Sequence, residues 1–158
     1  MWNEIDCRIR QAKEALKQFG YEAADVSSKE FYDYMTGEIF SDDSTTLRDV
    51  LNNEYIIIHE LVEISELKRI GRKLDKHVIM ETSKTPFYTA HFDATETELK
   101  YALYKHDTYW AKIRLRQYKE DIVDDDPNLP EELRVRAREI YEKYLRLAKE
   151  ASTQPMTQ

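Results

Sequence analysis

Residues 55–67, YIIIHELVEISEL, decide the fold of this chain. Apolar side chains point in almost every direction around a helix of this sequence, which is typical of a central helix covered on most sides. Yet His59, Glu60 and Glu63 lie at its centre. A polar group buried without a partner costs roughly 1–3 kcal/mol, and a buried charge costs more. These three side chains therefore either find partners inside the fold or belong to a binding site.

The apolar segment is part of a longer helix that we predict over about 45–70. The polar run 41–46 precedes it, with Asp43 or Ser44 as the cap of its first turn, and Gly71 ends it. The run YIII taken alone can also be interpreted as a short strand. The helical length of the surrounding pattern and the lack of a partner strand favour the helix.

The composition also favours helices. The chain has 158 residues with 3 glycines and 4 prolines, whereas a sandwich or barrel needs many tight turns. Apolar residues at three- and four-residue steps predict four further helices, the last but one of which bends or restarts near 105–107. These helices span about 2–19, 28–37, 86–120 and 130–150.

We therefore predict an all-α fold. The expected architecture is a single-domain bundle of about five helices over residues 1–150, in which the buried central helix (about 45–70) packs on the long helix (about 86–120). Residues 151–158 are predicted to form a frayed tail. Smaller features are predicted as well. They are a capping box at Ser27 and Glu30, a cap at Thr85, and an irregular segment or short strand at 78–80.

His59 and Glu63 have the spacing of two ligands to one metal ion. Residues four apart on a helix are offset by only about 40°, so these side chains point the same way. His91 and Glu98 lie on one stripe of the long helix, seven residues apart. If the two helices pair, the four side chains converge in the core, where helical bundles build metal sites.

The sequence thus predicts a metal site built from His59, Glu63, His91 and Glu98. Imidazole and carboxylate ligands together suit a divalent Zn, Fe, Mn or Ni ion. Glu60 lies next to this group and is predicted to support it or to act as a general base. A catalytic use would be metal-assisted hydrolysis, in which the ion lowers the pKa of bound water.

A structural interpretation competes with the metal site. The same acids can form an ion-pair network with His91, Lys68, Arg69 or Lys100, or can lie on a solvent-facing strip. The chain would then be a non-enzymatic interaction or oligomerisation module, with its aromatic residues (11 Tyr, 5 Phe, 2 Trp) lining a homodimer interface. The apolar residues around His59 favour the metal site, but the sequence leaves both interpretations open.

Other metal-enzyme patterns fit less well. His59-Glu60-x-x-Glu63 resembles only the first half of the His-Glu-x-x-His peptidase motif, because a glutamate replaces the second histidine. The Glu-x-x-His pattern of dinuclear bundle enzymes is absent. His106-Asp107 invites comparison with HD-type phosphohydrolases, but capping of a restarted helix explains Asp107.

The charge and the termini limit the remaining classes. A net charge of −7 argues against a nucleic-acid partner. The basic and aromatic residues of 107–119 could form an anion or single-strand platform, but the net charge favours a solvated helix face whose arginines pair with the acidic loop that follows. No run approaches the ~20 apolar residues of a membrane span, and the N-terminal residues lack a signal-peptide core. One cysteine, Cys7, precludes an intrachain disulfide framework. We expect a cytoplasmic protein.

Two segments carry a resemblance to a known family. They are NEYIIIHELVEISELKRIG at 53–71 and AHFDATETELKYAL at 90–103. With these segments, roughly residues 45–135 resemble a family of small, all-helical archaeal proteins. The resemblance implies an archaeal, cytoplasmic setting. Because that family has no assigned activity, the resemblance assigns no site residue.

Overall fold

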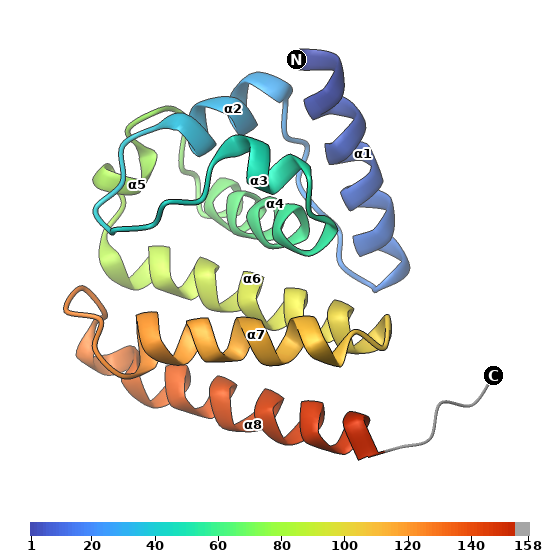
Figure 1. Ribbon diagram of the computed structural model, residues 1–158. Coiled ribbons are helices and arrows are strands. Elements are labelled where there is room, and N and C mark those ends of the chain that lie inside the picture. The colour runs from blue at the N-terminus through green and yellow to red at the C-terminus, as the bar shows by residue number, and fades with distance from the viewer. Residues whose placement is uncertain (154–158) are drawn as a thin grey trace. The chain divides into compact units, whose positions relative to one another are not determined.

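The computed structural model describes residues 1–153, and every regular element in that part of the chain is helical (Figure 1). The predicted all-α class is confirmed. The described part has eight α-helices, more than the five that the sequence predicted. They are α1 (Trp2–Gln18), α2 (Ser28–Thr36), α3 (Leu47–Leu51), α4 (Glu54–Arg69), α5 (Val78–Glu81), α6 (Lys84–Tyr104), α7 (Thr108–Tyr118) and α8 (Arg134–Thr153), with a π-helical turn η1 (Lys119–Val123) and a 3₁₀ turn η2 (Glu131–Leu133).

The chain divides into two compact units, Met1–Thr97 and Glu98–Gln158. The boundary falls inside α6, so the first part of that helix belongs to the first unit and its last turns belong to the second. The sequence predicted one domain and gave no sign of a boundary inside a helix.

The core of the first unit is built around α4. In Figure 1 α4 lies behind α3 with α1 beside it, and both helices pack against it. Burying each large apolar side chain stabilises the fold by roughly 1.5–3 kcal/mol. The buried apolar residues of α4 face several directions, as the sequence predicted for a central helix. They are Tyr55, Ile57, Ile58, Leu61, Val62, Ile64 and Leu67.

The predicted single helix over 45–70 is wrong, because the chain forms two helices there. Asn53 interrupts the pattern with extended backbone (φ −135°, ψ 117°), and its side-chain oxygen accepts hydrogen bonds from the first amides of α4. Thr46, rather than Asp43 or Ser44, caps α3 in a capping box with Asp49. An asparagine side chain competes with the helical backbone in this way, so a cap replaces the continued helix.

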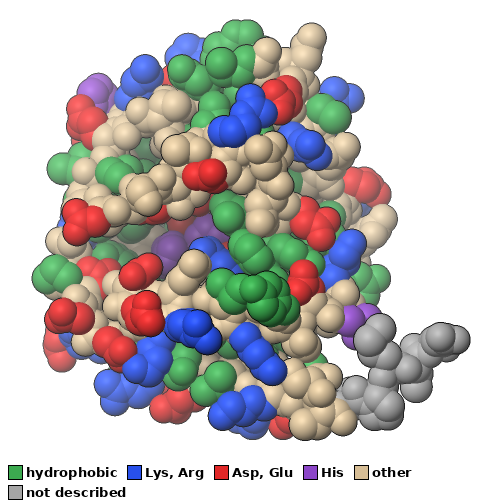
Figure 2. Space-filling view, viewed as in Figure 1, with side chains coloured by type: hydrophobic (Ala, Val, Ile, Leu, Met, Phe, Trp, Pro, Cys, Tyr) green, Lys and Arg blue, Asp and Glu red, His purple; other side chains and the backbone are tan. Residues whose placement is uncertain are grey.

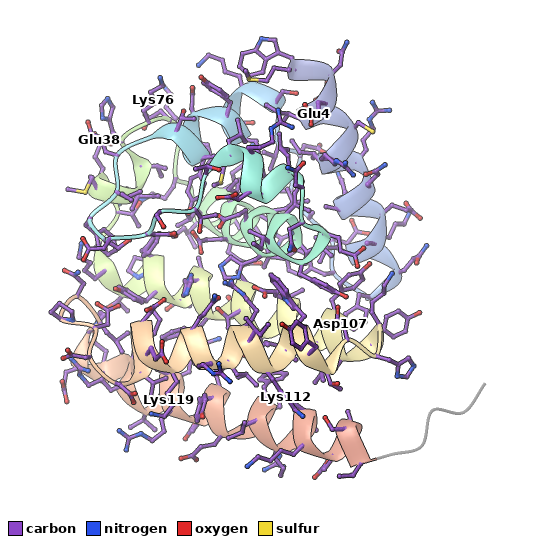
Figure 3. The ribbon with its side chains drawn as sticks, viewed as in Figure 1. Glu4, Glu38, Lys76, Asp107, Lys112 and Lys119 are labelled. Atoms are coloured by element: carbon purple, nitrogen blue, oxygen red, sulfur yellow. The ribbon has the colours of Figure 1, made fainter. Side chains whose placement is uncertain are left out.

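Several predicted helix ends are confirmed. Ser27 and Glu30 form the capping box of α2. Gly71 has φ +90°, and its amide bonds the Lys68 carbonyl while the next amide bonds Leu67, which is a Schellman end that favours glycine. The long helix restarts as predicted, because the side chain of Asp107 accepts from the Trp110 amide at 3.0 Å at the start of α7 (Figure 3).

Two local predictions between α4 and α6 are wrong. Residues 78–80 belong to the short helix α5 and not to a strand. Thr85 is not a cap, because α6 already begins at Lys84 and the Phe87 amide donates to the Ser83 carbonyl at 3.2 Å. Pro86 still lies in the first turn, where its missing N–H removes no helical hydrogen bond.

The end of α2 is held by close backbone contact with the segment before α5. The Glu38 amide donates to the Lys76 carbonyl at 2.8 Å, and both side chains are labelled in Figure 3. A Cβ atom at Gly37 would lie 2.5 Å from that carbonyl oxygen. A larger residue at this position would therefore displace one of the two backbone segments. This contact fixes the position of α2 within the first unit.

In the second unit, α7 and α8 pack against each other. The Tyr118 hydroxyl donates to the Ala137 carbonyl at 2.8 Å and joins the two helices. The last helix was predicted to begin near Pro130, but Pro130 precedes η2 and α8 begins at Arg134. The predicted frayed tail began at 151, yet α8 continues to Thr153. The rest of that tail, 154–158, lies outside the described residues.

The surface carries charges of both signs. Figure 2 shows lysine and arginine side chains interspersed with aspartate and glutamate over the visible face. Among the described residues, no helix combines the length and the apolar character that crossing a bilayer requires. The expected absence of a nucleic-acid partner stays a prediction.

The cap at Asn53 gives a test of how the central helix begins. Asn53→Ala removes the oxygen that accepts from the Tyr55 and Ile56 amides, so we expect the free energy of unfolding to fall by about 1 kcal/mol. Asn53→Asp keeps an acceptor there and should stay close to the parent. Urea denaturation followed by circular dichroism measures both. Equal stability of the two variants would contradict this account of the cap.

Candidate metal centre

The candidate site lies on α4 and on the first part of α6. His59 and Glu63 are one helical turn apart on α4, and only 3% and 5% of their surfaces are exposed. His91 lies on α6 within the first unit and is partly exposed. The sequence predicted that these three residues would meet, and the structure brings them together.

The three side chains form a tight group. Glu63 Oε2 lies 2.9 Å from His91 Nδ1 and 3.4 Å from His59 Nε2. The two imidazole rings are 4.9 Å apart between centroids and meet edge to face. One nitrogen from each histidine and one carboxylate oxygen all lie within 4.8 Å of one another. One oxygen of Glu63 therefore faces both histidines.

The other oxygen of Glu63 has a partner that the sequence analysis missed. The hydroxyl of Tyr34, on α2, donates a hydrogen bond to Glu63 Oε1. Tyr34 is buried, and the sequence analysis did not name it as a site residue. A buried tyrosine hydroxyl usually needs a hydrogen-bond partner, so the sequence could indicate that Tyr34 has one. The sequence does not identify Glu63 as the acceptor.

The charge of Glu63 is stabilised by its neighbours. Burial by itself would raise the pKa of this carboxyl, but hydrogen bonds and positive charge from His59 and His91 outweigh burial and hold the pKa well below its usual range. Burial and the negative charges of Glu63 and Glu60 raise the pKa of Tyr34 well above its ordinary value. The group therefore holds a carboxylate beside a protonated phenol.

The donor set fits a transition-metal ion. A tetrahedral ion with bonds of about 2.1 Å keeps neighbouring ligand atoms about 3.4 Å apart. The distance between Glu63 Oε2 and His59 Nε2 has this value, and the 2.9 Å distance to His91 Nδ1 is slightly shorter. The third distance, between the two histidine nitrogens, is at most 4.8 Å. Binding of an ion would therefore need side-chain shifts and the loss of the protons that these nitrogens direct at Glu63.

Glu98, the fourth predicted ligand, belongs to the second unit and is paired there. Arg114 donates to both of its oxygens, at 2.6 and 2.9 Å, and the indole N–H of Trp110 donates at 2.9 Å. The side chain of Glu98 is 1% exposed, so a buried charge has a bidentate cationic partner. This arrangement accounts for Glu98 without a metal ion.

The remaining polar residues considered from sequence are accounted for differently. Glu60 is half-buried and acts electrostatically on Tyr34. Lys68 pairs with Glu30 at 3.0 Å and Arg69 pairs with Glu66 at 2.6 Å, so these cations have acidic partners other than those that the sequence suggested. His106 is exposed in the turn before α7 with φ 60°, where Asp107 serves as a cap.

Comparisons with known proteins give no relative for this chain. No protein-family model, no curated protein and no solved structure matches it. The archaeal resemblance therefore stays a prediction.

The buried pair of Glu98 and Arg114 has a clear expected effect on stability. Arg114→Met leaves Glu98 buried without its cation, so we expect a loss of about 3 kcal/mol. Replacing both residues, as in Glu98→Leu with Arg114→Met, should recover part of that loss, because no charge is left unpaired while the Trp110 indole loses its acceptor. Denaturation curves of the single and double variants measure the difference.

The exposed pair of Arg134 and Glu131 provides the control. Arg134→Met should cost at most about 1 kcal/mol, because an exposed ion pair contributes little. If Arg114→Met costs no more than this control, the structural importance assigned to the buried pair is wrong.

Proposed function

We propose that this protein binds a divalent transition-metal ion through His59 Nε2, Glu63 Oε2 and His91 Nδ1. The observation that carries the proposal is the convergence of one carboxylate oxygen and two imidazole nitrogens within 4.8 Å, with two of the three residues almost fully buried. A carboxylate is costly to bury. The position of the Glu63 carboxylate beside two histidine nitrogens therefore supports a role as a metal ligand.

The kind of ion follows from the ligand types. Two imidazoles and one carboxylate suit Zn, Fe, Mn or Ni, whereas Ca and Mg prefer oxygen ligands throughout. Three protein ligands leave a position for water or a substrate, as in catalytic zinc sites. Glu98 is not among the proposed ligands, because Arg114 already neutralises its charge.

The reaction class that such a centre supports is metal-assisted hydrolysis. A bound ion lowers the pKa of its water toward neutrality. Glu60 is the nearby acid that is not assigned as a ligand, and its charge reaches Tyr34 beside the site. We therefore retain Glu60 as the proposed general base.

A second function is favoured by one observation. Glu63 has partners for both oxygens within the protein itself, namely Tyr34, His59 and His91. In that interpretation the group is a structural ion-pair network in a non-enzymatic module. The two functions predict different responses to metal ions.

Metal content tests the proposal directly. After incubation with Zn²⁺ and desalting, the parent protein should retain one zinc ion per chain, because three ligands are positioned together. His59→Ala and His91→Ala should each lose most of it. Elemental analysis by mass spectrometry measures the content.

The matched control is His77→Ala. His77 also faces a glutamate, with Nδ1 3.0 Å from Glu38 Oε1, but both side chains are more than half exposed. This variant should keep the zinc of the parent. Equal zinc in His59→Ala and His77→Ala, or none in the parent, would refute the proposed site.

Thermal unfolding separates the two functions. Zn²⁺ at about 100 times its dissociation constant stabilises a folded protein by roughly 2.7 kcal/mol, which should raise Tm by roughly 5–10 °C in a chain of this size. A chelator should reverse the shift, and Mg²⁺ should not produce it. A Tm that is independent of Zn²⁺ and chelator would favour the structural network.

A further inference from the structure

We infer that Tyr34 is a positioning residue that restricts Glu63 to one-oxygen binding of the metal ion and so keeps the coordination number low. This inference rests on the proposed function and adds a residue to it. Tyr34 would not touch the ion. It would act by occupying the oxygen of Glu63 that the histidines do not face.

The two oxygens of Glu63 have separate partners. Oε2 faces His59 Nε2 at 3.4 Å and His91 Nδ1 at 2.9 Å. Oε1 accepts the hydrogen bond of the Tyr34 hydroxyl. For both oxygens to bind one ion, the carboxylate would have to rotate, and Oε1 would have to leave Tyr34. The hydrogen bond therefore holds the carboxylate in the orientation that presents a single oxygen.

Tyr34 is well placed to resist that rotation. It is 97% buried, and a tyrosine hydroxyl has one proton to donate. Its helix, α2, begins at a capping box and ends where Gly37 meets the Lys76 backbone. Both ends of the helix are thus fixed, and the ring has little freedom to follow a moving carboxylate. Separating the two groups would leave a buried donor without an acceptor.

Restricting Glu63 in this way selects between classes of metal ion. Ca²⁺ takes six to eight oxygen ligands and commonly a two-oxygen carboxylate, whereas Zn²⁺ is satisfied by four ligands. With Glu63 limited to one oxygen, the protein supplies two nitrogens and one oxygen. Such a site favours Zn²⁺ and similar ions and excludes Ca²⁺. Hydrogen bonds that orient a ligand also raise metal affinity, and losing one typically costs 10–100-fold.

The test is Tyr34→Phe, which removes the hydroxyl and keeps the ring. Infrared difference spectra with and without Zn²⁺ report the mode of binding, because the antisymmetric and symmetric carboxylate stretches are widely separated for one-oxygen binding and closer together for two-oxygen binding. We expect a wide separation in the parent and a narrow one in the variant. Zinc affinity, measured by competition with a chromophoric chelator, should fall about 10–100-fold.

The control is Tyr118→Phe. It deletes another buried tyrosine hydroxyl, the donor to the Ala137 carbonyl, in the second unit. We expect this variant to have the same infrared difference spectrum and the same zinc affinity as the parent protein. A general loss of stability would affect both variants, whereas a changed carboxylate spectrum is expected in Tyr34→Phe alone.

The outcomes separate this inference from the proposed function. A parent that binds zinc and shows the narrow, two-oxygen separation overturns the role of Tyr34, and this measurement does not depend on whether the variant folds. A zinc-bound Tyr34→Phe spectrum identical to that of the parent also overturns it while leaving the metal site intact. A parent that shows no zinc-dependent spectrum overturns the proposed function and the inference together.

Discussion

The first unit depends on one constraint, which is the need to stabilise the buried carboxylate of Glu63. An isolated charge at this depth would be strongly destabilising or would be neutralised by a proton. Three donors from three helices prevent this, because Tyr34, His59 and His91 all face the same carboxylate. The apolar packing of α4 determines how deeply the Glu63 charge is buried. The partners of that charge determine which helices must meet beside it. Stability and the proposed metal binding thus depend on the same contacts.

Most of the helical architecture could be predicted from local signals. The capping box at Ser27 and Glu30, the glycine at 71 and the cap at Asp107 each act within a few residues, so the sequence shows them directly. The break at Asn53 was missed because the apolar pattern continues across it. Whether the helix breaks at Asn53 depends on whether its side chain caps a new helix or the backbone continues for another helical turn. The periodicity of apolar residues carries no information about that competition.

The candidate site was predicted only in part, for a related reason. His59 and Glu63 share a helix, so their spacing alone predicts that they lie together. The position of His91 beside them was predicted from the expected pairing of two helices. Tyr34 lies 29 residues before Glu63, and in the sequence it resembles any other buried aromatic residue. Glu98 was grouped with the histidines by its position on a stripe. Its bidentate bond to Arg114, 16 residues later, depends on how the restarted helix packs, which spacing alone does not reveal.

The most direct test of the metal site is anomalous diffraction at the zinc edge from crystals grown with Zn²⁺. We expect one anomalous peak at about 2.0–2.2 Å from each of the three atoms His59 Nε2, Glu63 Oε2 and His91 Nδ1. A peak found only at exposed side chains such as His77 and Glu38, with none among those three atoms, would contradict it. The buried group would then be a purely structural network.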